Sequence, residues 1–163
     1  MIEIVSYSEA FGSRVVDLIL PIQRTEFGFD IRLEDQPDLL SVASFYQTGA
    51  GGFWLALSRG EVVGTIALRD IGNNQDALRK MFVKDMYRGK EHSVAARLLE
   101  RLVQSATSAH VKDLYLGTTE KFTAAHRFYE KSGFARVPPE SLPAAFPRMS
   151  LDTRFYRRTL SAG

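Results

Sequence analysis

Apolar and polar residues follow strand and helix periodicities along the first third of the chain. Apolar residues alternate with others over residues 2–6, which predicts a short strand. Over residues 11–22 they recur at helical spacing, and Pro21 should kink or end this helix because it lacks an amide hydrogen. Residues 37–46 form a second helical pattern, with a proline suited to its first turn. One strand and two helices are therefore expected here.

Strand patterns follow in the middle of the chain. Residues 53–58 and 61–69 are apolar, β-branched and aromatic runs joined by Arg59-Gly60, a two-residue loop that predicts a hairpin. The next strand ends at Lys84 and should pair antiparallel with the strand before it. Three cations bracket its apolar residues, which suits a mostly buried strand with solvent-exposed ends. These cations are Arg79, Lys80 and Lys84.

Helix and strand alternate in the second half of the chain. Helical spacing begins near His92 or Ser93, and residues 113–118 form a short strand pattern. Another helix precedes strands over residues 134–137 and 153–160. A strand, a helix and a strand in this order imply a right-handed crossover and a parallel pair. The sheet should therefore be mixed.

These elements predict an α/β fold, with a mixed central sheet of about seven strands flanked by about four helices. The 163 residues suit a single domain, 1–163, that buries roughly two-thirds of its unfolded surface. The first residues have no basic region and no long apolar run, and no segment approaches the roughly twenty apolar residues of a membrane span. We therefore expect a cytoplasmic protein with no membrane partner.

Charge and cysteine content narrow the chemistry. Lysine and arginine number 21 against 19 acidic residues, and this net charge of +2 gives little support for a nucleic-acid partner, which needs a basic face. The absence of cysteine excludes disulfides, thiol catalysis and cysteine-ligated metals. His92, His110 and His126 are too far apart in sequence to suggest a zinc site. We expect neither a metal nor nucleic acid.

The stretch richest in chemistry is 78–102, which reads as a strand, a short basic loop and an amphipathic helix. The loop holds Arg88, Gly89 and Lys90, and the glycine lets the backbone turn. A helix N-terminus leaves its first amides unpaired and carries a partial positive charge. Such a loop can present amides and cations to a phosphate-bearing ligand. An ordinary basic connection between a strand and a helix is the alternative.

This loop has the sequence Tyr-Arg-Gly-Lys and precedes a leucine-rich helix. It resembles the acetyl-CoA pyrophosphate loop of the GNAT superfamily of N-acetyltransferases, whose motif is Arg/Gln-x-x-Gly-x-Gly/Ala. Arg88 takes the first position, and Glu91 and Ser93 replace the two small residues. A carboxylate at Glu91 would repel phosphates unless it points away or pairs with a cation. The resemblance assigns pyrophosphate binding to Arg88, Gly89, Lys90, Glu91, His92 and Ser93.

A second run, Ala124–Phe134, resembles the GNAT helix that carries a Phe/Leu-Tyr pair and ends at a glycine before a strand. Phe128 and Tyr129 form this pair. The resemblance implies that Phe128 contacts acetyl-CoA and that Tyr129 is the general acid for the leaving thiolate. The family's upstream asparagine is Phe122 here. Phe122 and Ala125 share helical spacing with Tyr129, so a core aromatic is the alternative.

The resemblance implies acetyl-CoA as cosubstrate, with its pantetheine arm along the backbone of Met81, Phe82 and Val83 as an added strand, and with no metal. A primary amine of a small molecule or a protein would attack directly, and the Val83 amide could polarise the thioester. An ammonium with a pKa near 10 must first lose a proton. The family's acceptor groove follows the first helix, which here corresponds to the aromatic segment 23–30, and a mobile loop is the alternative. Glu26 in this segment is the first candidate base, with an ordinary surface carboxylate as the alternative. Further candidates are Asp70, Asp76 and His126.

Two other functions stay open. A domain that binds acyl-CoA as a sensor, without turnover, would explain the missing loop glycines. Alternatively, clustered cations could form a surface for nucleic acid or an acidic protein, with binding that falls steeply with salt. These cations are Arg79, Lys80, Lys84, Arg88 and Lys90. The oligomeric state is also open, because an exposed C-terminal strand could pair across a homodimer whatever the function.

Overall fold

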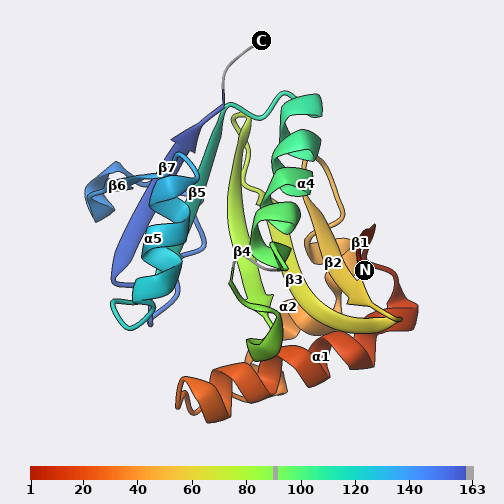
Figure 1. The fold of residues 1–163 in the computed structure, drawn as a ribbon. Coiled ribbons are helices and arrows are strands. Elements are labelled where there is room, and N and C mark those ends of the chain that lie inside the picture. Colours follow the sequence, from red (N-terminus) through yellow and green to blue (C-terminus); the bar gives the residue numbers. More distant parts are fainter. Residues whose placement is uncertain (90–91, 161–163) are drawn as a thin grey trace.

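A computed structural model describes residues 1–89 and 92–160. Its centre is a seven-stranded sheet of order β1-β2-β3-β4-β5-β7-β6 (Figure 1). Only β4 and β5 pair in parallel among these strands, so the predicted mixed sheet is confirmed. The strands are β1 (Ile2–Ser6), β2 (Gly52–Ser58), β3 (Glu61–Asp70), β4 (Gln75–Val83), β5 (Asp113–Thr118), β6 (Ala135–Val137) and β7 (Arg154–Thr159).

Helices cover both faces of the sheet and bury a separate apolar core on each. Val94, Leu98 and Leu102 of α4 pack with β2, β3 and β4 on one face, where Tyr129 of α5 also lies (Figure 1). Val15 and Ile19 of α1 pack on the other face with side chains of α2 and α3. The helices are α1 (Gly12–Pro21), α2 (Pro37–Leu40), α3 (Val42–Phe45), α4 (Val94–Ser108) and α5 (Thr123–Lys131). No helix in the described ranges is long and apolar enough to span a bilayer.

Local chemistry explains where the helices end. As predicted, α1 ends at Pro21, and the chain continues as a π-helix over Ile22–Glu26, in which the Phe27 amide donates to the Ile22 carbonyl. The helix predicted over 37–46 is wrong in one respect, because it divides at Ser41 into α2 and α3. Ser41 has non-helical dihedrals, and its hydroxyl donates to a carbonyl of the preceding turn.

Two expectations about strands are also corrected. Lys80 does not lie at a wet strand end, because β4 runs through it and its side chain is only 7% exposed. A bulge between the pairs Thr65–Phe82 and Ala67–Arg79 contains Lys80, which has a φ of 54°. The Thr65 hydroxyl donates to the Lys80 carbonyl at 2.7 Å. The Lys80 ammonium donates to Gln36 and lies 3.4 Å from the Asp38 carboxylate. The C-terminal strand β7 is not an edge strand, because β6 lies outside it.

β4 and β5 stay together over only a short ladder. Gln75, Asp76 and Ala77 pair with three consecutive residues of β5, and beyond Ala77 the two strands diverge (Figure 1). From Leu78 to Val83, β4 therefore has a paired edge toward β3 and an open edge toward β5. This opening positions the candidate site.

Asp76 carries a testable consequence of this junction. Its carboxylate is fully buried without a hydrogen-bond partner among the described residues, and burial, aided by the charge of Asp70, raises its pKa to about 7. The folded protein therefore holds a proton that the unfolded chain releases near pH 4, and stability should fall as pH rises from about 4 to 7. In urea titrations, Asp76→Asn should flatten this slope and add up to about 4 kcal/mol to the free energy of unfolding at pH 8. An unchanged slope would contradict the assignment.

Candidate active site

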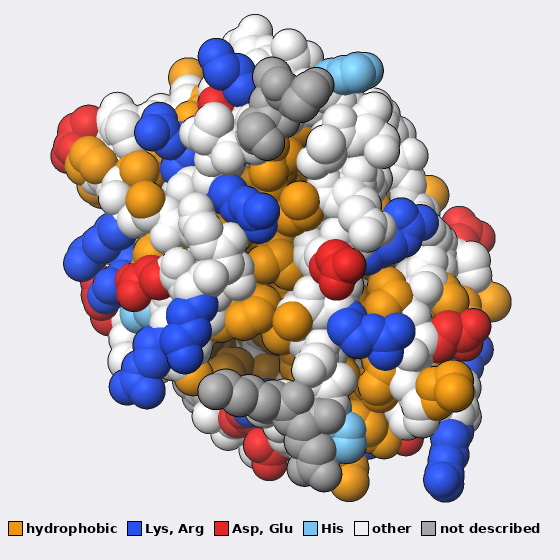
Figure 2. Space-filling model, turned by 45° about the horizontal axis from the view of Figure 1, so that its top comes forward, with side chains coloured by type: hydrophobic (Ala, Val, Ile, Leu, Met, Phe, Trp, Pro, Cys, Tyr) orange, Lys and Arg blue, Asp and Glu red, His pale blue; other side chains and the backbone are white. Residues whose placement is uncertain are grey.

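The open edge of β4 presents different side chains to the two faces of the sheet. Met81 and Val83 pack toward α4 and α5, and Phe82 packs toward the α1 side. On the α4 side, a groove of about 810 Å³ runs between α4 and the end of α5, with Leu99 and Val103 among its lining residues. Figure 2 shows hydrophobic side chains along the bottom of a hollow on this side of the molecule, with Lys and Arg side chains and also acidic side chains around it, and Glu100 is among the lining residues of the groove. An elongated ligand with apolar and anionic parts would suit such a surface.

The loop between β4 and α4 brings Arg88 to the same edge. Its guanidinium donates through Nε to the Val83 carbonyl at 2.7 Å. Gly89 has a φ of 100°, which only glycine adopts without strain, and Ser93 directly precedes the first residue of α4. The His92 ring lies 5.1 Å from the Tyr87 ring. The predicted phosphate ligands Lys90 and Glu91 lie outside the described residues.

Arg88 is paired with Glu26, the predicted base. Arg88 Nη2 donates to Glu26 Oε2 at 2.9 Å, and Nη1 bonds Oε1, so the ion pair is bidentate. Both side chains are about one-third exposed. The sequence placed these two residues in one site but did not predict this contact, which joins the end of the π-helix to the phosphate loop. A pyrophosphate at Arg88 would have to share or displace the carboxylate.

Tyr129 lies on α5 with only 5% of its surface exposed. Its ring is 5.6 Å from that of Phe128, 5.7 Å from Phe134 and 6.2 Å from Tyr156. Within the described part of the chain its hydroxyl makes no hydrogen bond, and burial raises its pKa well above the usual 10. The hydroxyl therefore stays protonated at physiological pH and can donate a proton. The same burial fits a core aromatic.

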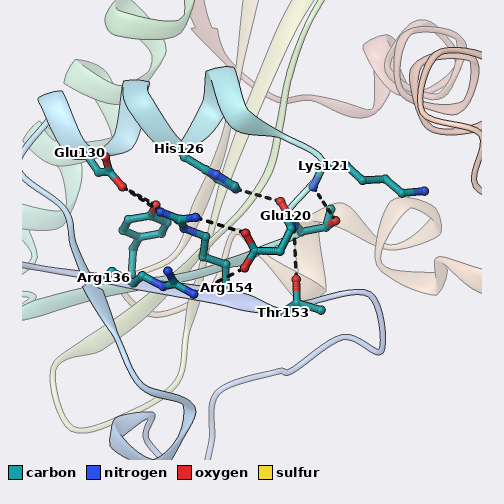
Figure 3. Close-up of polar contacts among 9 residues, drawn as sticks. Glu120, Lys121, His126, Glu130, Arg136, Thr153 and Arg154 are labelled. Atoms are coloured by element: carbon teal, nitrogen blue, oxygen red, sulfur yellow. Dashed lines mark hydrogen bonds and ion pairs between the residues drawn. The ribbon is translucent and has the colours of Figure 1, made fainter.

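A polar network holds α5 on the sheet (Figure 3). Arg154 of β7 donates to Glu120 at 3.2 Å and to Glu130 of α5 at 3.3 Å, and the Tyr156 hydroxyl donates to Glu130 at 2.7 Å. His126 bonds the Thr119 carbonyl at 2.8 Å through its ring nitrogen. Sequence reasoning missed this network, because its members are far apart along the chain. His126 serves it, and the network fixes the helix that carries Tyr129.

The other candidate bases have separate surroundings. Asp70 accepts hydrogen bonds from the Ala50 and Gly72 amides at 2.9 and 2.8 Å, which fixes two loops. Asp70 and Asp76 pair across β3 and β4 at the end of these strands farthest from Val83. The segment after Glu26 instead crosses toward α5, as the Phe27 ring lies 4.2 Å from that of Phe122. Of the candidate bases, Glu26 is thus the carboxylate that lies beside the loop between β4 and α4.

The cations considered as a common basic surface are not arranged as one. Lys80 is buried beside a carboxylate, and Lys84 and Arg88 each pair with a glutamate. Lys90 lies outside the described residues. Among the residues that are described, no group of three or more acidic or histidine side chains could hold a metal ion. The absence of a metal stays a prediction.

The fold and the strand-loop-helix site define the class of protein. The sequence model of the acetyltransferase (GNAT) family matches residues 16–134, most of the chain. The chain therefore belongs to the GNAT family of acetyltransferases, as the two motifs predicted.

Similar proteins place the chain within this family. A GNAT-family acetyltransferase of Staphylococcus aureus Mu50 is 36% identical with a TM-score of 0.94, over 99% of this chain and 100% of that one. N-acetylaspartate synthetase of Xenopus tropicalis is 38% identical over 104 residues, 61% of this chain and 37% of that protein. The chain thus spans little more than a third of this curated relative. The PaiA N-acetyltransferase of Thermoplasma acidophilum, in complex with coenzyme A, is 16% identical and shares the fold, with a TM-score of 0.73 over 98% of this chain and 99% of that one.

Proposed function

We propose that this chain is an acetyl-CoA-dependent N-acetyltransferase, a single domain that transfers an acetyl group to a primary amine. The observation that carries the proposal is the open edge of β4 between the phosphate loop and Tyr129. The structural neighbour in complex with coenzyme A supports acetyl-CoA as the donor. A cytoplasmic location and the independence of metal belong to the same proposal.

The backbone of β4 supports binding of the pantetheine arm. The Lys84 amide donates to the Val63 carbonyl of β3, whereas the Val83 carbonyl accepts from Arg88. Because successive residues of a strand turn their amides to opposite sides, the Val83 amide faces the opening. Acetyl-CoA would lie along Met81–Val83 as an added strand, and this amide would polarise the thioester carbonyl.

The chemical step would be direct attack in a ternary complex. The amine nitrogen forms a bond to the thioester carbon, the bond from carbon to sulfur breaks, and Tyr129 gives its proton to the thiolate. A base takes the proton that the amine loses. Glu26 would serve once acetyl-CoA has taken over its partner Arg88, because a carboxylate held in a bidentate pair is a poor base.

The test is an assay of the purified chain with acetyl-CoA and a panel of primary amines. The panel should contain amino acids, because a relative is an N-acetylaspartate synthetase, together with polyamines and peptide N-termini. Release of the CoA thiol together with an acetylated product in the mass spectrum would support the enzyme. Saturable binding of acetyl-CoA without any product would favour the sensor instead.

A further inference from the structure

The face of the sheet opposite α4 and α5 is covered in two separate pieces. Helices α1, α2 and α3 pack over the first four strands. Residues 138–153 pack over β5 and β7, where the Phe146 ring lies 6.2 Å from the Phe155 ring. Asp152 fills the space above Gly117, at which a Cβ would come within 2.6 Å of its carboxylate. The strands β4 and β5, which lie under different covers, diverge beyond Ala77.

Arg79 of β4 connects the two covers. Its guanidinium lies 5.6 Å from the Phe45 ring and 5.9 Å from the Tyr46 ring, both on the helical side. On the other side its Nη2 donates to the Met149 sulfur at 3.4 Å. A thioether is a weak acceptor, and a guanidinium has five donors. No carboxylate lies within ion-pair distance of Arg79 in residues 1–89 and 92–160.

Lys80, the next residue, shows what a cation with a structural role has here. Its ammonium is buried against Gln36 and the Asp38 carboxylate. Arg79 has no such partner, although it is half-buried and points to the same face. Burying a cation without a counter-charge is costly unless something else offsets it. A ligand carboxylate would supply that counter-charge.

Neighbouring charges make this place favourable for an anion. Arg148 stacks 5.0 Å from the Phe155 ring, and Arg69 stacks 3.8 Å from the Phe45 ring while donating to the Phe45 carbonyl. Asp152 accepts from the Met149 amide, and burial raises its pKa although Arg79 and Arg148 act against this. The place between the covers therefore has more positive than negative charge.

The proposed reaction puts the acceptor on this face. Tyr129, which would protonate the leaving thiolate, lies on the α5 side of the sheet. The amine must then approach the thioester carbon from the other side. Arg79 lies four residues before Val83, whose amide would hold the thioester carbonyl, and this corresponds to about 13 Å along a strand. The long Arg79 side chain, together with the amine and the carboxylate of one small molecule, can span that interval.

We propose that the acceptor carries a carboxylate, and that Arg79, assisted by Arg148, binds it. This inference rests on the proposed acetyltransferase function. It names amino acids and related amino-carboxylates as the substrate class, in preference to polyamines and amino sugars.

The experiment compares matched acceptors. L-amino acids, their carboxamides and the amines that lack the carboxylate are assayed with acetyl-CoA. We expect kcat/KM for the best amino acid to exceed that of its carboxamide by about tenfold or more. Arg79→Gln should raise KM for the amino acid by about 10- to 100-fold. The same variant should change KM for the carboxamide by less than about twofold. Arg79→Lys keeps the charge but not the two parallel donors of the guanidinium. Its KM for the amino acid should lie between those of the unmodified protein and Arg79→Gln.

Controls separate recognition from folding and from the proposed function. Arg101→Gln removes an exposed arginine of α4 and should leave kcat/KM unchanged for both the amino acid and its carboxamide. Thermal melts identify an unfolded variant, in which case Arg79→Lys decides. Equal kcat/KM for the amino acid and its carboxamide, or an equal loss of kcat/KM for both in Arg79→Gln, overturns the inference, whereas the proposed acetyltransferase function still stands.

If no amine is acetylated, the proposed function fails. Calorimetry of N-acetyl amino acids on the CoA-saturated protein then decides the inference alone: binding that Arg79→Gln weakens supports it, and no binding overturns it.

Discussion

Replacing Tyr129 with phenylalanine is expected to lower kcat by about 100-fold or more, the usual contribution of a general acid. The leaving CoA thiolate would then depart without a proton. Because the Tyr129 hydroxyl makes no hydrogen bond with any described residue, its removal leaves no partner unsatisfied. The melting temperature and the Kd for acetyl-CoA should therefore stay close to those of the unmodified protein. Steady-state kinetics and calorimetry on the same preparation check both expectations.

A matched control for this variant is Tyr7→Phe. Tyr7 follows β1 at the far edge of the sheet, and its ring lies 5.2 Å from Phe53. Loss of its hydroxyl should leave kcat unchanged. If Tyr129→Phe keeps full activity, the hydroxyl is not the acid, and Tyr129 is a core aromatic. If both variants bind acetyl-CoA and neither the unmodified protein nor Tyr129→Phe turns over, the sensor is favoured.

Arg88 and Glu26 should affect acetyl-CoA binding in opposite directions. Arg88→Ala removes charge-assisted contacts with the pyrophosphate and should raise Kd by about 10- to 100-fold. Glu26→Gln releases Arg88 from its pair, and because partly exposed ion pairs are weak, Kd should fall by only about two- to fivefold. If Glu26 is also the base, Glu26→Gln should lower kcat while tightening binding. Calorimetric titration with acetyl-CoA gives both Kd values.

The control for this pair is Lys84→Ala. Lys84 is a half-exposed cation next to the same loop and pairs with Glu61, so its removal changes the net charge equally. Lys84→Ala should weaken the binding of acetyl-CoA far less than Arg88→Ala does. If Glu26→Gln binds acetyl-CoA more weakly, the Glu26 carboxylate orients Arg88 for the pyrophosphate and does not compete with it. Loss of affinity that is equal for Lys84→Ala and Arg88→Ala would indicate long-range charge without a specific contact.

Local signals explain why most of the fold could be predicted. The Arg59-Gly60 turn has φ values of 52° and 81°, which suit a tight hairpin, and the helical spacing after Ser93 predicted α4 with its buried row. The helix over 37–46 could not be bounded, because the break at Ser41 depends on one side-chain hydrogen bond. The role of Lys80 was hidden for another reason. Its partner Asp38 is distant in sequence, and the bulge that turns it inward leaves no pattern in the sequence.

The site shows the same division between local and distant contacts. Arg88 and Tyr129 were found because short motifs surround them, and their roles stay predictions. The contact between Glu26 and Arg88 joins residues that are 62 positions apart, and no periodicity encodes it. Arg79 was placed in a basic cluster by its neighbours in sequence, whereas in the fold it contacts helix α3 and Met149, which are distant from it along the chain.

The short ladder between β4 and β5 has a consequence for how the chain opens. Only three ladder pairs join β4 to β5 in the described chain, although side chains on both sides of this ladder share the apolar core under α4 and α5. Units with few shared hydrogen bonds open at a lower free energy than the whole protein unfolds. The helix with Tyr129 belongs to the C-terminal unit made by β5, β7, β6 and α5, so a protease should cut there first. A cosubstrate that contacts both units would oppose this local opening and slow the cleavage. The lifetime of the protein would then depend on its supply of acetyl-CoA.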